Sequence, residues 1–201
     1  MIAEAIRRSP LADYADRFAA LSATTVGELS IRELAFVSQI NLRADPKDAN
    51  VMQRLDEALG LALPVFPNTV AAKGGRRALW LGPDEWMVVG PDGQREALEQ
   101  ALRKGLNGAF GSIVDVSANR TLLEIRGQKA RALLAHGVAI DLDPRSFGPG
   151  RCAQTLLAKA QVIAERRDVE TAFHLYVRSS FASYLAGWLL DAAATDPKLD
   201  Q

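Results

Sequence analysis

Two stretches of this chain have the same order of predicted elements, and almost no sequence separates them. Each reads as a strand, a helix, two strands and a second helix, and only residues 117–120 stand between the last strand of the first stretch and the first strand of the second. The first stretch ends with one more strand, and its full order β-α-β-β-α-β is typical of a split βαβ or ferredoxin-like unit. A junction this short favours two halves packed as one body. We therefore expect an α+β fold of two packed ferredoxin-like halves, residues 31–118 and 119–194.

Hydrophobic alternation and helical spacing predict the elements of the first half. Asp45 and Pro46 suit a helix start, and Gly60 suits a helix end. The predicted elements are a strand over 36–43, a helix up to Gly60, a connection over 61–75, strands over 78–81 and 86–89 around a tight turn, a helix ended by Gly105, and a strand over 112–116.

The second half follows the same pattern. Residues 122–126 alternate as a strand, residues 127–136 suit a short helix, and residues 156–162 and 173–177 read as further strands, with Leu156, Ala158, Ala160 and Val162 expected on one face. The last predicted helix carries an apolar stripe, with residues at positions i, i+3, i+4, i+7 and i+8. It consists of Phe181, Tyr184, Leu185, Trp188 and Leu189. We expect this stripe to pack on the sheet, and the rival interpretation is a partner-facing surface.

The ends of the chain show weak periodicity. Residues 1–30 contain Pro10 and Gly27 and read as an N-terminal arm, which lies either across a partner or across the chain's own core. Residues 195–201 are expected to form a C-terminal tail.

Composition excludes several classes of protein. The 24 basic and 24 acidic residues cancel, and no basic groove with interleaved aromatic residues occurs, so we expect no nucleic-acid partner. No apolar run reaches the roughly 18 residues of a membrane span, and no apolar core follows the two N-terminal arginines. A single cysteine excludes an internal disulfide. These features predict a cytoplasmic protein without a membrane partner.

Acidic residues near turns are the first candidates for chemistry. Asp84 and Glu85 are adjacent between two aromatic-rich strands, but neighbouring turn residues rarely converge as a general acid–base pair. Asp115, Asn119 and Arg120 surround the junction and could orient a ligand, although Asp and Asn also satisfy local backbone donors. We favour structural roles for both groups.

The remaining candidates also favour structural roles. Cys152 has no histidine near it in sequence and reads as a small core residue. His136 lies at a helix end, and His174 is expected to face away from the main apolar side. Residues 74–77, Gly-Gly-Arg-Arg, lack the spacing of a phosphate-binding motif and read as a mobile loop. We therefore predict no catalytic, cofactor-binding or metal-binding residue in this chain.

Four stretches carry a family resemblance: LGPDEWMVVG near residue 85, SIVDVSANRTLLEIRG, GPGRCAQTLLAKAQV and FHLYVRSSFASYLAGWLLDA. They closely resemble the γ subunit family of heterotetrameric sarcosine oxidase. This resemblance implies a fold like that of the folate-binding aminomethyltransferases, without their catalytic equipment.

The resemblance also implies a function within a complex. The family's complex contains α, β, γ and δ chains and oxidatively demethylates sarcosine to glycine, forming hydrogen peroxide. FAD, FMN, NAD and the one-carbon acceptor tetrahydrofolate are expected in the other chains and none in this one. The alternatives are a stand-alone folate-binding or aminomethyltransferase-like protein and a free-standing scaffold of an unrelated pathway.

Overall fold

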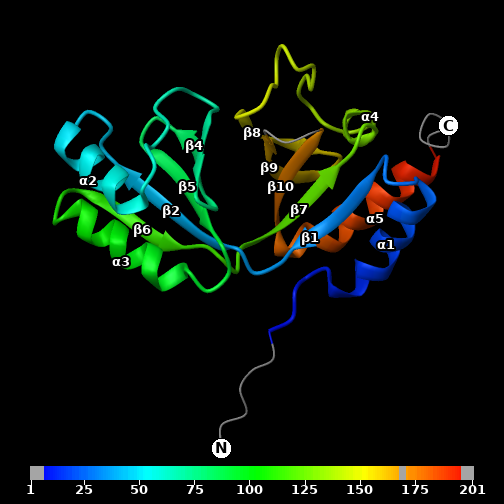
Figure 1. Cartoon of the computed structure of the whole chain (residues 1–201), viewed down its shortest axis with the longest axis horizontal. Coiled ribbons are helices and arrows are strands. Elements are labelled where there is room, and N and C mark those ends of the chain that lie inside the picture. The colour runs from blue at the N-terminus through cyan, green and yellow to red at the C-terminus, as the bar shows by residue number, and fades with distance from the viewer. Residues whose placement is uncertain (1–6, 168–170, 196–201) are drawn as a thin grey trace, which may run out of the picture.

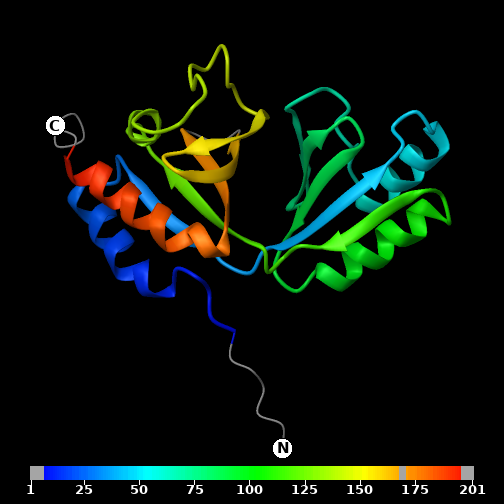
Figure 2. The same ribbon diagram turned by 180° about the vertical axis from the view of Figure 1, so that it is seen from behind.

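Two five-stranded antiparallel sheets form the centre of the molecule in this computed structural model, which describes residues 7–167 and 171–195. The strand order is β3-β4-β5-β2-β6 in the first sheet and β1-β7-β10-β9-β8 in the second. Helices lie on the outer side of each sheet, and the inner faces of the sheets meet between them (Figures 1 and 2). This arrangement of two α+β halves confirms the predicted fold class.

The first sheet is made from one continuous stretch of chain. Its elements are β2 (Ser38–Ala44), α2 (Ala49–Leu59), β3 (Val70–Lys73), β4 (Arg76–Gly82), β5 (Glu85–Gly90), α3 (Arg95–Leu106) and β6 (Gly111–Asp115). Omitting β3, the order is that of a split βαβ unit with an antiparallel sheet. The predicted hairpin around residues 82–85 is present. Strand β3 lies within the predicted connection and is too short and exposed to show clear alternation.

The ends of the two helices on this sheet differ from the predictions in detail. Asp48, not Asp45, caps α2, and its carboxylate accepts hydrogen bonds from the backbone N–H groups of Asn50 and Val51. Gly60 ends α2 in the left-handed conformation, as predicted. Gly105 lies inside α3, where an added Cβ would lie 3.1 Å from Leu55 of α2. This glycine therefore permits the close approach of the two helices and does not end α3.

The second sheet takes one of its strands from the N-terminal part of the chain. Its elements are β1 (Ser30–Leu34), β7 (Arg120–Arg126), α4 (Ala130–Ala135), β8 (Cys152–Leu157), β9 (Ala160–Arg166), β10 (Ala172–Arg178) and α5 (Ser179–Thr195). Strand β1 pairs with β7 over five residues. The predicted first half began at residue 31, so the structure differs from that division of the chain. The sequence signal for β1 is weak because this edge strand buries a single residue, Ile31, and therefore shows no clear alternation of apolar and polar residues.

Residues before β1 form part of the second half's core. A turn of 3₁₀-helix, η1 (Ala12–Tyr14), leads into α1 (Ala15–Thr24). Leu11 and Phe18 are buried with residues of α4, α5 and the second sheet. The predicted arm is therefore an integral layer over its own core in the described part. Residues 1–6 and 196–201, which include most of the predicted tail, lie outside the described residues.

The last helix buries a narrower face than the sequence stripe predicts. Its buried residues are Ala182, Leu185, Ala186, Leu189 and Ala193. Phe181 and Tyr184 are 44% and 40% exposed. Small alanines let the helix lie close to the sheet, which moves the large aromatic side chains to its flanks. The expectation that the whole stripe serves the core is therefore wrong for Phe181 and Tyr184.

Leu156, Ala158, Ala160 and Val162, predicted to share one face of a single strand, instead lie in a hairpin. Strands β8 and β9 pair around a two-residue turn, in which Ala158 has a φ of 52°. The turn places Leu156 opposite Gln161, so Leu156 lies on the opposite face from Ala160 and Val162.

Three apolar clusters hold these layers together. One lies between the first sheet and helices α2 and α3, and one between the second sheet and helices α1, α4 and α5. The third lies between the inner faces of the two sheets and contains Leu79, Met87, Val89, Leu122, Cys152, Ile163 and Tyr176. The halves therefore share a core.

Candidate functional site

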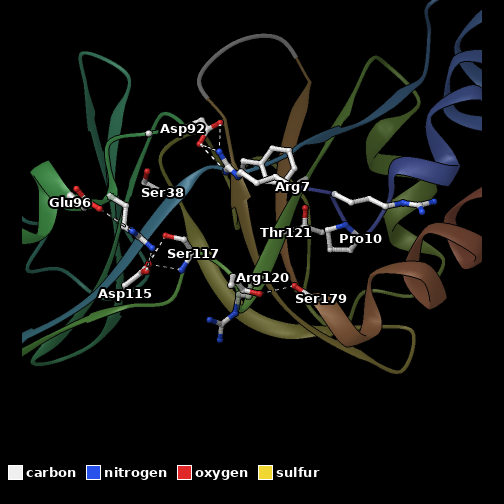
Figure 3. Close-up of a pocket in the computed structure, with 15 residues that line it drawn as sticks. Arg7, Pro10, Ser38, Asp92, Glu96, Asp115, Ser117, Arg120, Thr121 and Ser179 are labelled. Carbon is white, nitrogen blue, oxygen red and sulfur yellow. Dashed lines mark hydrogen bonds and ion pairs between the residues drawn. The ribbon is translucent and has the colours of Figure 1, made fainter. Parts of the chain in front are cut away.

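A hollow of about 760 Å³ lies where the chain crosses between the two halves (Figure 3). The N-terminal segment, the start of α3, the crossing between β6 and β7 and the start of α5 contribute its lining. Charged and hydroxyl side chains dominate the labelled residues. Because these side chains are charged or polar, the chemistry of the hollow depends on how they are paired.

The N-terminal segment is tied across this hollow by Arg7. Its guanidinium donates hydrogen bonds of 3.0 and 3.1 Å to the two carboxylate oxygens of Asp92. It also lies 4.1 Å from the ring centroid of Phe36. The hydrogen bonds from Arg7 lower the pKa of the Asp92 carboxyl. Of the two roles considered for the N-terminal segment, these contacts favour the one on the chain's own core.

Asp115 and its neighbours also pair within the hollow. The backbone N–H and the hydroxyl of Ser117 donate to the Asp115 carboxylate at 2.9 and 2.6 Å, and Arg95 approaches it at 3.4 Å. Burial opposes ionisation, but these donors outweigh it and lower the pKa of Asp115. The backbone carbonyl of Asn119 accepts from the N–H of Ser179 at 2.9 Å.

The hollow lacks the parts of a hydrolytic site. None of the described residues that line it is a histidine or a cysteine. Ser117 donates its proton to a carboxylate of lowered pKa, which is a poor base at neutral pH. Asp92 and Asp115 are thus paired with arginines, and these pairs fix the crossing chain segments to one another.

A second charged cluster is buried between the two sheets. The carboxylate of Glu165 on β9 has no exposed surface and forms an ion pair with Arg77 of β4. It also accepts a hydrogen bond of 3.1 Å from the hydroxyl of Tyr176. Burial opposes ionisation of Glu165, but the neighbouring His174 and Arg77 outweigh it and lower its pKa. Glu165 therefore links the two sheets as a buried anion.

His174 extends this cluster toward the outer strand of the second sheet. Its Nδ1 lies 3.6 Å from Glu165, and its Nε2 lies 3.3 Å from Glu124 of β7. Glu124 in turn accepts a 2.7 Å hydrogen bond from Arg32 of β1. His174 thus faces the inner side of the sheet, and the cluster connects one strand of the first sheet with four of the second.

This cluster is not apparent in the sequence, because its members are far apart in the chain. One signal was available. Glu165 lies two residues after Ile163 on β9, so both side chains point to the inner face of the sheet. A charged residue on the inner face of a buried strand needs a partner of opposite charge.

Cys152 lies in the shared core with 1% of its surface exposed. Its Sγ lies 3.5 Å from the carbonyl oxygens of Thr69 and Trp80. Burial, aided by Glu165, raises the pKa of this thiol to about 12. The thiol is therefore protonated at neutral pH and is a poor nucleophile.

The other sequence candidates hold turns in place. Glu85 accepts hydrogen bonds from Asn41 at 2.7 Å and Arg43 at 2.6 Å, and Asp84 lies 3.9 Å from Arg43. Both acidic residues thus attach the β4–β5 turn to β2. His136 is exposed at the end of α4.

Residues 74–77 form a hairpin and not the expected loop. Gly74 and Gly75 have φ values of 59° and 82°, and β3 pairs with β4 on either side of them. Successive positive φ values suit the two central residues of a tight hairpin turn. The two arginines that follow belong to β4.

The described residues contain no group of three or more histidine, cysteine or acidic residues placed to hold a metal ion. Among their helices, none combines the length and the apolar character that crossing a membrane requires.

Comparison with known proteins identifies the family. The family model described as "Sarcosine oxidase, gamma subunit family" matches residues 43–195. Sarcosine oxidase subunit gamma of an Arthrobacter species is 38% identical over 188 residues, which cover 93% of this chain and 90% of that protein. The corresponding protein of Corynebacterium sp. strain P-1 is 36% identical with the same coverage.

Solved structures agree with this assignment. The structure of heterotetrameric sarcosine oxidase from Corynebacterium sp. U-96 in complex with pyrrole 2-carboxylate contains a chain with a TM-score of 0.85 and 35% identity, with 97% of each chain covered. Aminomethyltransferase T of the glycine cleavage system from Bartonella henselae has a TM-score of 0.63 at 17% identity, covering 85% of this chain and 48% of that one, which shows a shared fold. The chain belongs to the sarcosine oxidase gamma subunit family.

Proposed function

We propose that this chain is the noncatalytic structural γ subunit of a heterotetrameric sarcosine oxidase. The match over 97% of both chains to a subunit of that enzyme carries the proposal. The complex would oxidatively demethylate sarcosine to glycine with formation of hydrogen peroxide and with folate as one-carbon acceptor. The α, β and δ chains would be its partners and would hold FAD, FMN, NAD and tetrahydrofolate, and the assembly would be cytoplasmic.

The geometry of the chain supports a structural role. The acidic groups of the junction hollow are paired with arginines, and the buried carboxylate between the sheets is paired with Arg77. The thiol of Cys152 is protonated at neutral pH because its pKa is raised to about 12. No described histidine or cysteine lines the hollow, so a general base for its hydroxyl groups is missing there.

Expression with and without the other subunits tests the proposal. The isolated chain should be colourless and inactive on sarcosine, and co-expression with the α, β and δ chains should yield a complex that contains it and turns over sarcosine. Stoichiometric flavin absorbance of the isolated chain, or peroxide formation by it, would contradict a noncatalytic role. Tight binding of tetrahydrofolate by the isolated chain, without assembly, would favour a stand-alone folate-binding protein.

A further inference from the structure

Two arginines lie side by side at the same end of adjacent strands. Arg120 begins β7 and Arg178 ends β10, and the two residues are directly paired in the antiparallel register. Directly opposed side chains point to the same face, about 4.5–5.5 Å apart at Cβ, and like charges in this position repel. The pair therefore costs stability unless an anion compensates it.

The described residues leave this pair without a carboxylate. No hydrogen bond or ion pair within 4.0 Å joins either guanidinium to another described residue. Burial and the charge of Arg178 lower the pKa of Arg120, and the charge of Glu85 only partly opposes them. Glu85 itself accepts from Asn41 and Arg43. The Glu85 carboxylate, which acts on Arg120 electrostatically, is thus already hydrogen-bonded to other residues.

Asp115 of the junction hollow does not compensate the charge of this pair either. Asp115 accepts from Ser117 and lies 3.4 Å from Arg95. Figure 3 shows the guanidinium of Arg120 turned away from Asp115, with no dashed line to it. Other arginines of the chain, such as Arg43 and Arg77, have a carboxylate within 4.0 Å.

The surroundings of the pair suit a carboxylate side chain. Arg120 and Arg178 line a second hollow of about 490 Å³, and its described lining includes no acidic residue. Gln161 and Thr155 add neutral polar groups to the hollow, and Leu156 beside them is 45% exposed. Guanidinium groups bind carboxylates with paired hydrogen bonds, and an exposed leucine can contact the methylene groups of the same side chain.

We propose that Arg120 and Arg178 form an acceptor site for an acidic side chain of another subunit. This inference rests on the proposed function, because it requires an assembly. Charge complementarity selects a glutamate or aspartate, and the exposed Leu156 beside the arginines favours a protein surface over a small free anion. Arginine together with apolar residues is enriched at the centre of protein interfaces.

The test compares two double variants in the full chain. Arg120→Gln/Arg178→Gln removes the acceptor charges. The matched control, Arg103→Gln/Arg145→Gln, removes two arginines that pair with Glu99 at 2.7 Å and Asp143 at 2.8 Å in the same chain. Affinity for the remaining subunits is measured at two salt concentrations, together with thermal unfolding of each isolated chain.

We expect the acceptor variant to bind the remaining subunits at least about tenfold more weakly, with a smaller salt dependence, while the control binds normally. The isolated acceptor variant should unfold at the same temperature as the wild type or at a higher one, because the repulsion between the two arginines has been removed. This combination separates a lost contact between subunits from a folding defect.

Four outcomes would overturn the inference. If the acceptor variant binds the remaining subunits as tightly as the wild type, the inference is refuted, while assembly of the wild type leaves the proposed function intact. An equal loss of affinity in both variants indicates a general charge effect. Stabilisation of the isolated wild type by millimolar inorganic phosphate, abolished in the acceptor variant without an effect on assembly, indicates a small-anion site. Failure of the wild-type chain to assemble refutes both proposals.

Discussion

The five strands of each sheet occupy corresponding positions, but the two sheets are built differently along the chain. In the first sheet, the edge strand beside β2 is β6, which follows α3 directly in sequence. In the second sheet, the corresponding position next to β7 is filled by β1, which comes from the opposite end of the chain. The strand that fills this edge position is therefore determined by which segment can pair there and bury apolar surface. Its place in the sequence matters less.

The strongest test of this comparison targets the contact between the sheets. Glu165→Ala should destabilise the chain by about 3–5 kcal/mol, because Arg77 and His174 would remain buried without their shared carboxylate. Urea unfolding followed by circular dichroism measures the effect. The control Glu99→Ala removes a surface ion pair within α3 and should cost under about 0.5 kcal/mol. Equal effects would show that the buried cluster does not hold the sheets together.

Glu165 should also make the stability of the chain depend on pH in a defined direction. The pKa of Glu165 is lowered in the folded chain, so its stabilisation is complete above the unfolded value of about 4.3 and is lost as pH falls through the lower folded value. The stability advantage of the wild type over Glu165→Gln should therefore shrink below about pH 4.3. Parallel stability curves for the two proteins over this range would contradict the assignment.

The next test concerns the N-terminal layer of the second half. Phe18 is 3% exposed, so Phe18→Ala should cost about 3–5 kcal/mol. Phe110 in the first half is 98% exposed, and Phe110→Ala should change stability by no more than about 0.5 kcal/mol. Thermal unfolding of both variants measures the difference. A negligible effect at Phe18 would return residues 11–24 to the role of a loose arm.

A smaller effect is expected where β7 meets the segment before β1. Gly127 has a φ of +118°, and an added Cβ would lie 2.1 Å from the carbonyl oxygen of Glu28. Gly127→Ala should therefore destabilise by about 3 kcal/mol. Gly108→Ala is the control, because its φ is +80° with no atom within 4 Å of the added carbon, and it should cost only about 1–2 kcal/mol. Similar losses at both sites would mean that the segment before β1 can move away easily.

The smallest effect is expected at Cys152. Cys152→Ala should leave turnover of the assembled enzyme nearly unchanged and cost about 1 kcal/mol of stability. In the folded wild type, alkylation of the thiol at pH 8 should be slow, because a pKa of about 12 leaves almost no thiolate. A loss of turnover by orders of magnitude with intact assembly would reveal a chemical role.

The sequence predicts the first sheet better than the second. The β4–β5 hairpin, Gly60 and the spacing of α2 and α3 are local signals, and they appear where expected. Strand β1 and the helix before it were missed because their partners lie about one hundred residues away. Local alternation cannot show which sheet an edge strand joins.

The candidate residues divide in the same way. Asp115 and Ser117 pair across two residues, so local hydrogen bonding at Asp115 was predictable. The partnership of Arg77 and Glu165 spans eighty-eight residues and depends on how the two sheets meet. The Arg120–Arg178 pair likewise follows from the register of β7 and β10, which the sequence does not specify.

The position of β1 also affects how the chain folds during synthesis. Ser30 and its partner Arg126 are separated by 96 residues. At about 5–20 residues per second, the ribosome needs about 5–20 s to reach β7 after releasing β1. The first sheet, which ends at Asp115, can form in that interval, while β1 remains unpaired. Because unpaired strand edges promote aggregation, a pause in translation before residue 126 would prolong the most vulnerable state of the nascent chain.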